Sequence, residues 1–193
     1  FIAYRSMIDY MGAKAVALPN RMENNFSFDA DELLSLINKN TRLIILNSPA
    51  NPTGGVVPHN ELKKLAKGLE NYPEVFILSD EIYSRILFDG HKHTSLLSFP
   101  EVRERVIVLD GWSKTYSMTG WRLGYGIFPK KIFKFAEKLA INCHSCISIP
   151  TQIAGIEALN GNQDSVNKMV DVFQERRDFL VEQINTIKNV KCL

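Results

Sequence analysis

The sequence lacks the charge imbalance that marks some classes of binding protein. Its 23 Lys and Arg residues nearly balance 21 Asp and Glu residues, which leaves a formal net charge of +2. That balance argues against the basic stripe of a nucleic-acid-binding protein and against a polybasic membrane-binding tail. The sequence also has no uninterrupted apolar run of about 18 residues, the length that predicts a membrane span. We therefore expect neither a nucleic-acid partner nor a membrane partner.

Cysteine is also scarce. Cys143, Cys146 and Cys192 are too few for a disulfide scaffold, which fits the reducing cytosol and predicts a cytoplasmic protein. Cys143 and Cys146 form a lone C-x-x-C pair around His144, whereas a structural zinc ion needs four ligands. We expect no metal site, and we expect the two thiols to be free and packed at the end of a helix.

What the sequence does contain is typical of a globular protein. Hydrophobic residues make up 45% of its 193 residues and charged residues 23%, enough apolar material for a sizeable core. The chain begins with Phe1 rather than Met and ends at 190–193 without a helix stop signal. We expect one large domain, or part of one, cut from a longer protein.

Apolar strand patterns alternate with amphipathic helix patterns along the chain. The predicted strands cover 13–18, 42–47, 75–78, 106–109 and 122–128. The predicted helices start at the N-cap candidate Asp29 and cover 60–71, 130–142, 150–159 and 164–189. The alternation predicts an α/β fold of three layers, α/β/α, with a mostly parallel central sheet covered on both faces. We place the domain boundary at 160–163, so that 1–160 form one domain and 161–193 a long connecting helix.

Two further polar segments suggest no site. His91 and His93 lie in a polar loop and are expected to be solvated. The charged residues of the last predicted helix are expected to form a solvated face.

Polar side chains follow three successive predicted strands. Asn51 lies in the Pro- and Gly-rich loop after the strand 42–47, Asp80 and Tyr83 follow the next strand, and Lys114 follows the third. Arg122 comes eight residues after Lys114. Because ligand sites in open α/β sheets form at the carboxyl ends of the strands, we expect these residues to gather at one edge.

This set of side chains suits one kind of cofactor. A lysine at the end of a buried strand loses solvation, which favours the neutral, nucleophilic amine. A buried aspartate needs a positive partner. Together they suit an aldehyde cofactor with a basic ring nitrogen, while Asn and Tyr can bond a ring oxygen and Arg can bind a phosphate. Those are the requirements of pyridoxal 5'-phosphate (PLP).

Each residue also has an ordinary structural interpretation. Lys114 could be a solvated surface lysine, and Asp80 could cap a helix that follows it. Asn51 could serve only the turn, Tyr83 could be half-buried core, and Arg122 could lie on a helix face or an interface. Position at the strand ends favours the site interpretation.

Three segments carry a family resemblance. NSPANPTGG at 47–55, LSDEIYSRILFDG at 78–90 and DGWSKTYSMTGWRLGYGIFP at 110–129 resemble, in order and approximate spacing, the large-domain motifs of class I/II aminotransferases. These are fold-type I PLP-dependent enzymes, and the similarity is greatest to the bacterial aspartate and aromatic aminotransferase branch. The resemblance extends from residue 1 to about residue 189.

The resemblance implies a role for each residue of the set. Lys114 would be the Schiff-base lysine and would carry the proton during the reaction. Asp80 would pair with the protonated ring nitrogen. Asn51 and Tyr83 would bond the ring oxygen, and Arg122 would bind the phosphate.

The resemblance also implies roles at two further positions. Phe1 falls where the family has an aromatic ring that stacks on the cofactor, with Tyr4 following, although Phe1 could equally be a core residue. Many relatives carry a phosphate-binding Ser three residues before the lysine, where this chain has Gly111. Ser113, next to Lys114, is the candidate substitute.

The resemblance implies a reaction and an incomplete enzyme. It implies amino transfer between an amino acid and a 2-oxo acid in a homodimer. Residues 1–160 would be the PLP-binding large domain without its N-terminal part, and 161–193 would lead to an absent small domain. The first phosphate-binding helix and the substrate-binding arginine would lie outside the chain, so the chain alone would be inactive.

Two alternatives remain open. The chain could belong to another fold-type I PLP enzyme, such as a C–S lyase or an aminocyclopropane-carboxylate synthase-like enzyme. It could also belong to the non-catalytic, aminotransferase-like sensor domain of a transcription factor. The motifs do not separate these chemistries, and they do not name the amino-acid substrate.

Overall fold

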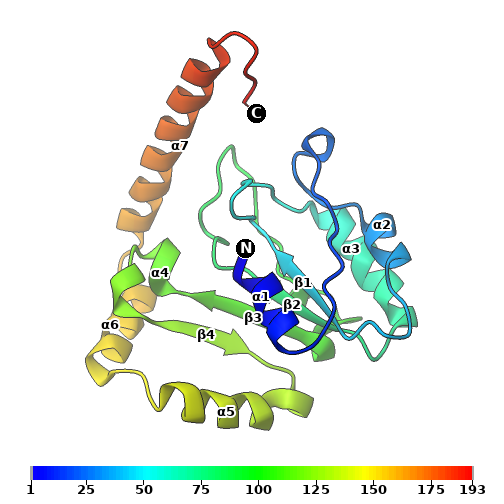
Figure 1. The fold of residues 1–193 in the computed structure, drawn as a ribbon. Coiled ribbons are helices and arrows are strands. Elements are labelled where there is room, and N and C mark those ends of the chain that lie inside the picture. The colour runs from blue at the N-terminus through cyan, green and yellow to red at the C-terminus, as the bar shows by residue number, and fades with distance from the viewer. Residues whose placement is uncertain (1, 193) are drawn as a thin grey trace.

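The computed structural model describes residues 2–192, without the side chain of Ile2, and its centre is one mixed sheet. Within these residues the strands are β1 (Leu43–Asn47), β2 (Phe76–Asp80), β3 (Val106–Gly111) and β4 (Gly124–Ile127), in the order β1-β2-β3-β4. β1 and β2 are parallel, as are β2 and β3, while β4 runs antiparallel to β3 (Figure 1). The predicted α/β architecture with a mostly parallel sheet is confirmed.

The helices flank this sheet and extend beyond it. They are α1 (Ile2–Tyr10), α2 (Ala30–Ser35), α3 (His59–Gly68), α4 (Trp112–Thr115), α5 (Lys130–His144), α6 (Ile149–Asn160) and α7 (Asp164–Asn185). Short 3-10 turns occur at Met22–Asn24, Leu69–Asn71, Leu96–Ser98, Arg103–Arg105 and Thr119–Trp121. In Figure 1, α5 runs alongside β4 and α7 points away from the sheet. No helix within residues 2–192 is long and apolar enough to cross a membrane.

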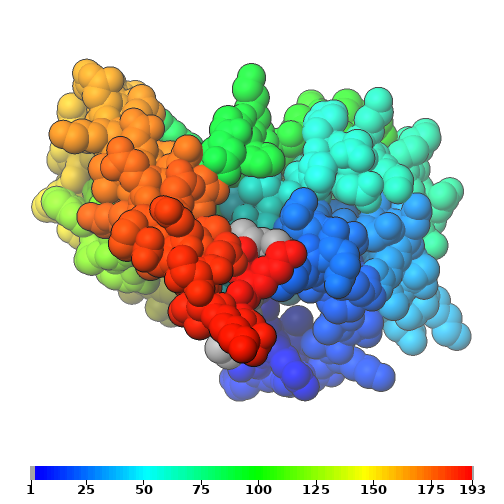
Figure 2. Space-filling view, turned by 90° about the horizontal axis from the view of Figure 1, so that it is seen from above, coloured from blue at the N-terminus to red at the C-terminus, as the bar shows by residue number. Residues whose placement is uncertain are grey.

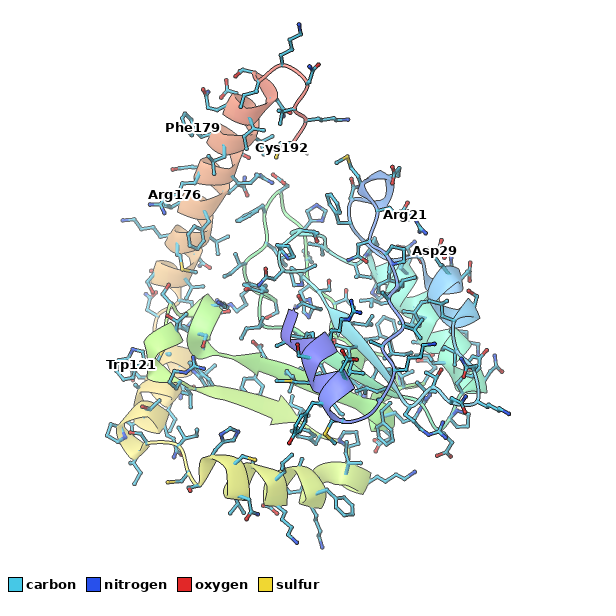
Figure 3. The ribbon with its side chains drawn as sticks, viewed as in Figure 1. Arg21, Asp29, Trp121, Arg176, Phe179 and Cys192 are labelled. Atoms are coloured by element: carbon cyan, nitrogen blue, oxygen red, sulfur yellow. The ribbon has the colours of Figure 1, made fainter. Side chains whose placement is uncertain are left out.

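The predicted start of α2 is confirmed in detail. The Asp29 side chain accepts hydrogen bonds from the backbone N–H groups of Asp31 and Glu32, which satisfies two donors at the helix start. The Glu32 carboxylate instead pairs with both terminal nitrogens of Arg21, at 2.6 and 2.8 Å. Figure 3 shows Arg21 and Asp29 close together in the segment that leads into α2.

The main core lies between the sheet and the α2–α3 layer. Its fully buried side chains are Leu65, Leu69, Ile77, Leu96, Val102 and Val106. Leu62, Leu65 and Ala66 face inward at helical spacing on α3, so the amphipathic pattern of this helix points at the sheet. In the space-filling view, the α2–α3 layer (blue to cyan) lies on the right, while α7 runs from the left (orange) toward the middle (red) (Figure 2).

Several sequence expectations about strands and helix ends are wrong. Residues 13–18 form no strand: the segment has no regular structure, and Val16 is exposed. A strand needs a neighbour to complete its hydrogen bonds, and this segment pairs with none of the described strands. β1 is less buried than predicted because it is an edge strand, and α7 ends at Asn185 rather than at residue 189.

The expected packing of the C-x-x-C pair is also wrong. Cys143, at the end of α5, and Cys146, just after it, are both exposed, although their thiols are free as predicted. Within residues 2–192, no cluster of His, Cys, Asp or Glu side chains is arranged to hold a metal ion. The pair is therefore a surface feature of the described structure.

Candidate active site

The strand register brings the carboxyl ends of β1, β2 and β3 together, as predicted. Asn47, the last residue of β1, lies opposite Asp80, the last residue of β2. Asp80 in turn lies opposite Leu109 of β3. β3 ends at Gly111 and α4 follows it directly. Residues from the loop after β1, from the end of β2 and from α4 therefore share one edge of the sheet.

Asn47, for which no role was predicted, holds the loop after β1 to the end of β2. The Asn47 side chain donates to the Asp80 carbonyl oxygen at 3.2 Å and accepts from the Asn51 backbone N–H at 2.9 Å. The backbone N–H of Ser48 also donates to the Asp80 carbonyl, at 3.2 Å. These bonds place Asn51 over the end of β2.

Asn51 and Tyr83 are in contact, as their predicted shared role requires. The Asn51 side-chain amide donates to the Tyr83 hydroxyl oxygen at 3.4 Å. Asn51 is exposed and Tyr83 is half-buried. Two donors that could serve one ring oxygen are therefore adjacent, although they lie 32 residues apart in sequence.

Asp80 is half-buried, and its side chain receives two hydrogen bonds. Its carboxylate accepts from the Tyr4 hydroxyl and from the Ile82 backbone N–H at 3.3 Å. Burial of Tyr4, and then its hydrogen bond to Asp80, raise the pKa of this phenol, so it remains a donor at neutral pH. The sequence carries no signal for this contact, because α1 and β2 are 76 residues apart at these positions.

Lys114 lies in α4 on the same side of the edge as Tyr83. It is half-buried, and its Nζ lies 5.8 Å from the centroid of the Tyr83 ring, within the range of a cation–π contact. Tyr83 therefore connects the amine of Lys114 with the amide of Asn51. Lys114, Tyr83 and Asn51 therefore meet at the sheet edge at which Asp80 ends β2.

The remaining predicted site residues are less well connected. Arg122 is exposed, with a left-handed backbone (φ 55°), and it donates to the Thr119 carbonyl within its own turn at 2.9 Å. No hydrogen bond joins it to the other site residues in the described chain. Ser113 is half-buried beside Lys114. Phe1 lies outside the described residues.

The structure explains why residue 111 is glycine. Gly111 pairs with Gly124 across β3 and β4. A Cβ atom at Gly111 would lie 2.8 Å from the Gly124 Cα and 3.0 Å from the Leu123 carbonyl oxygen, both backbone atoms. A serine at this position would therefore require the two strands to move apart.

Glu81, which follows Asp80 directly in the sequence, has a buried carboxylate. Glu81 is buried and bonds Ser79, Ser95, the Leu96 backbone and His93. His93 is therefore not solvated as predicted: its side chain is 15% exposed and its Nε2 lies 2.9 Å from Glu81 Oε2. The polar residues around His93 predict an exposed loop. A loop that folds back onto the end of a sheet has no periodic sequence pattern from which this contact could be predicted.

The chemistry of this donor set fits PLP. An amine, a carboxylate and a phenol–amide pair meet at one strand edge, and these are the groups that an aldehyde, a ring nitrogen and a ring oxygen require. Lys114, Asp80, Tyr83 and Asn51 are the residues that could hold this cofactor.

Comparison with known proteins gives a consistent result over the whole chain. The sequence profile of the family described as "Aminotransferase class I and II" matches residues 1–193. An aspartate aminotransferase of Pinus pinaster is 37% identical over 194 residues, which cover 99% of this chain and 39% of that protein. A probable aspartate/prephenate aminotransferase of Rickettsia felis is 36% identical, covering 100% of this chain and 47% of its own length.

Solved structures share the fold. The aspartate aminotransferase of Rhizobium meliloti superimposes with a TM-score of 0.96 and 31% identity, over 100% of this chain and 48% of that one. The N-succinyldiaminopimelate aminotransferase of Mycobacterium tuberculosis gives a TM-score of 0.91 and 28% identity, over 97% and 49%. The chain thus spans about half the length of the proteins it matches, or less.

Proposed function

Since the chain belongs to the class I and II aminotransferases, we propose that it forms the cofactor-binding part of an enzyme that transfers an amino group from an amino acid to a 2-oxo acid. Enzymes of this family depend on PLP. The observation that carries the proposal is the meeting of Lys114, Tyr83, Asn51 and Asp80 at one sheet edge. When bound, PLP supplies an electron sink that stabilises negative charge on the substrate Cα.

Lys114 is the proposed nucleophile and proton carrier. Its amine is the group that would hold the cofactor through its aldehyde, and the same amine, when free, would move the proton at the substrate Cα. Its half-buried position beside the Tyr83 ring limits both its solvation and its range of movement. The lysine would therefore remain close to the proton it has to move.

Asp80 is the proposed partner of the ring nitrogen. An ionised carboxylate has about four lone-pair positions, and the described structure fills two of them, with Tyr4 and the Ile82 backbone. The remaining positions are available to a ring N–H. The two existing bonds orient the carboxylate before any cofactor arrives, which favours binding.

Asn51 and Tyr83 are the proposed donors to the ring oxygen, and Arg122 and Ser113 are the proposed contacts to the phosphate. The resemblance assigns Phe1 to the face of the ring. We propose that residues 1–160 form the PLP-binding domain, that 161–193 lead toward the small domain, and that the active enzyme is a homodimer. The substrate-binding arginine would lie outside the chain, so residues 1–193 alone should not catalyse the reaction.

The test uses the full open reading frame that encodes this chain, purified with PLP. We expect a visible absorbance band from lysine-bound cofactor, absent in Lys114→Ala and retained in the control Lys130→Ala, an exposed lysine at the start of α5. Lys114→Ala and Asp80→Ala should each slow amino transfer by at least about 10²–10⁴-fold, the usual contribution of a proton-transferring group.

The choice of substrates separates the alternatives. Aspartate is the first donor to test, because relatives carry that name. Consumption of the donor with equimolar formation of a new amino acid supports amino transfer. Release of ammonia or thiol instead would identify a lyase, and PLP binding without turnover of any donor would favour the sensor alternative. A band that survives Lys114→Ala would contradict the assignment of the lysine.

A further inference from the structure

Glu81 is the most deeply buried acid at the candidate site, and the proposed mechanism does not use it. It directly follows Asp80, and its side chain is 7% exposed. A carboxylate is rarely buried to this extent unless it is fully paired. Its partners therefore indicate what the burial achieves.

The Glu81 carboxylate accepts every hydrogen bond that it makes in the described structure. Oε1 accepts from the hydroxyls of Ser79 at 2.9 Å and Ser95 at 3.0 Å, and from the Leu96 backbone N–H at 3.4 Å. Oε2 lies 2.9 Å from His93 Nε2, and since an ionised carboxylate can only accept, the imidazole is the donor. We call this set of residues the Glu81 cluster.

The Glu81 cluster joins two parts of the chain at the end of β2. Ser79 belongs to β2 itself, whereas His93, Ser95 and Leu96 belong to the segment that returns to the sheet before β3. Leu96 is 1% exposed and is part of the main core, so this segment is firmly anchored. The Glu81 carboxylate therefore connects the strand end to a rigid support.

The backbone of Glu81 extends this connection to the predicted site residues. Its N–H donates to the Leu109 carbonyl of β3 at 2.9 Å, and its carbonyl accepts from the Ser84 N–H at 2.8 Å, which closes the turn that holds Tyr83. Asp80 precedes Glu81 directly. A shift of Glu81 would therefore move the carboxylate of Asp80 and the ring of Tyr83 together.

We infer that Glu81 is a positioning residue, whose buried bonds to Ser79, His93, Ser95 and Leu96 hold Asp80 and Tyr83 where the cofactor ring needs them. The inference rests on the proposed function. The Glu81 cluster resembles the outer shell of a metal site, in which residues that do not touch the bound metal orient the residues that do. Neither Glu81 nor His93 touches the reacting atoms in this arrangement.

The decisive comparison sets two Glu81 variants against a matched control elsewhere in the core layer. Glu61 is also a poorly exposed carboxylate, and it accepts a hydrogen bond from the Ala30 backbone N–H at 2.8 Å, between α2 and α3. Glu81→Ala removes the whole cluster. Glu81→Gln keeps an oxygen for Ser79, Ser95 and Leu96, and presents an amide that the other His93 tautomer can accept.

Three quantities are measured on the full-length protein: thermal unfolding of the cofactor-free form, the dissociation constant of PLP, and visible circular dichroism of bound PLP. We expect Glu81→Ala to weaken PLP binding about tenfold, the lower end of outer-shell effects at metal sites, and to change the dichroism. Glu81→Gln should restore most of both. Glu61→Ala should lower the unfolding temperature but leave PLP affinity and dichroism unchanged.

The possible outcomes separate this inference from the proposed function. If Glu81→Ala binds PLP with wild-type affinity and dichroism, Glu81 is only structural and the inference is wrong. If Glu81→Ala does not fold, His93→Ala and Ser95→Ala each remove one donor and should weaken PLP binding by a smaller factor; wild-type behaviour of both overturns the inference. If the wild-type protein shows no lysine-bound band, the proposed function fails and the inference fails with it.

Discussion

The two halves of the molecule follow equally clear sequence patterns but differ in how well they are buried. In the first, every buried residue of the main core cluster lies between Phe28 and Val108. In the second, from β4 onward, the strand residues are all exposed, α5 has no buried residue in the described structure, and α7 has only Val166. The same amphipathic spacing therefore produced a closed core in one half and open apolar faces in the other.

This difference shows what periodicity can and cannot predict. Phe135 on α5 and Phe179 on α7 occupy apolar positions of well-formed helices, yet they are 75% and 61% exposed, and Figure 3 shows Phe179 on the part of α7 that projects from the sheet. Periodicity fixes which face of a helix is apolar. Which surface covers that face depends on parts of the fold that local sequence does not describe.

The largest expected effect is on the free energy of unfolding, when an apolar helix residue is truncated to alanine in each half. Leu65 is fully buried on α3, so Leu65→Ala should lower the free energy of unfolding by about 2–5 kcal/mol, from lost burial and the cavity left behind. Phe135→Ala should change it by no more than about 0.5 kcal/mol, as is usual for exposed positions. Urea unfolding of both variants measures the contrast. An equal loss in Phe135→Ala would mean that a surface outside the described residues covers α5.

The first half contains both predictions that the structure confirms and predictions that are wrong, and the wrong ones have physical causes. Asp29, Leu62 and Leu65 follow local rules of capping and periodicity, and the structure confirms them. The segment 13–18 has a strand-like composition but no neighbouring strand in the described residues, and pairing rather than propensity makes a strand.

The candidate site was predictable where it lies at strand ends and unpredictable where it depends on long-range contacts. Asn51, Asp80 and Lys114 could be placed together because parallel strands end at a common edge. The bond from Tyr4 to Asp80 and the bond from His93 to Glu81 could not, because each depends on a helix or loop that folds back over the sheet. Composition and spacing contain no information about that return.

The next largest change in the free energy of unfolding is expected at the boundary between the halves, where β3 pairs with β4. Gly111→Ser should lower the free energy of unfolding by about 1–3 kcal/mol, because the added Cβ meets backbone atoms of β4 that can only move by separating the strands. It should not improve PLP affinity, although the family resemblance leads one to expect a phosphate-binding serine at this position. Gly120→Ser is the control, since a Cβ there meets nothing within 4 Å. Tighter PLP binding by Gly111→Ser at unchanged stability would contradict the steric explanation.

A smaller effect is expected where α6 is attached to the rest of the fold. Trp112 Nε1 donates to the Gly155 carbonyl at 2.9 Å, and the Trp112 ring packs edge-on against Tyr125. Trp112→Phe keeps an aromatic ring at this position and removes the donor, and the lost hydrogen bond should lower the free energy of unfolding by about 0.5–1.5 kcal/mol. Hydrogen exchange should speed up in α6 more than in α3. Trp121→Phe, at an exposed tryptophan, should change neither quantity; equal effects from both would mean that α6 does not depend on this bond.

The smallest effect concerns the attachment of α7 to the loop after Tyr83. Arg177 donates to both oxygens of Asp89 at 2.7 Å, and the Gln174 side chain accepts from the Asp89 backbone N–H at 3.0 Å. The hydrogen bonds from Arg177 lower the pKa of Asp89. A carboxyl group with a lowered folded-state pKa stabilises the fold fully above its ordinary pKa of roughly 3.9, and loses that stabilisation as the pH falls through the lowered value. Because the pair is exposed, salt should weaken it as well.

Hydrogen exchange across α7, measured from neutral pH down to below the ordinary carboxyl pKa and corrected for the intrinsic rate, tests this attachment. In the wild-type protein, protection of α7 should fall with acidification before protection of α3 does, because apolar burial, which does not titrate, holds α3 in addition to carboxylate contacts such as that of Glu61 with the Ala30 N–H. Arg177→Gln should remove that acid step and its salt dependence, and leave α3 unchanged. If α7 in Arg177→Gln keeps the wild-type acid step, another group controls the attachment. If α7 and α3 lose protection together, the two halves unfold as one unit despite their unequal burial.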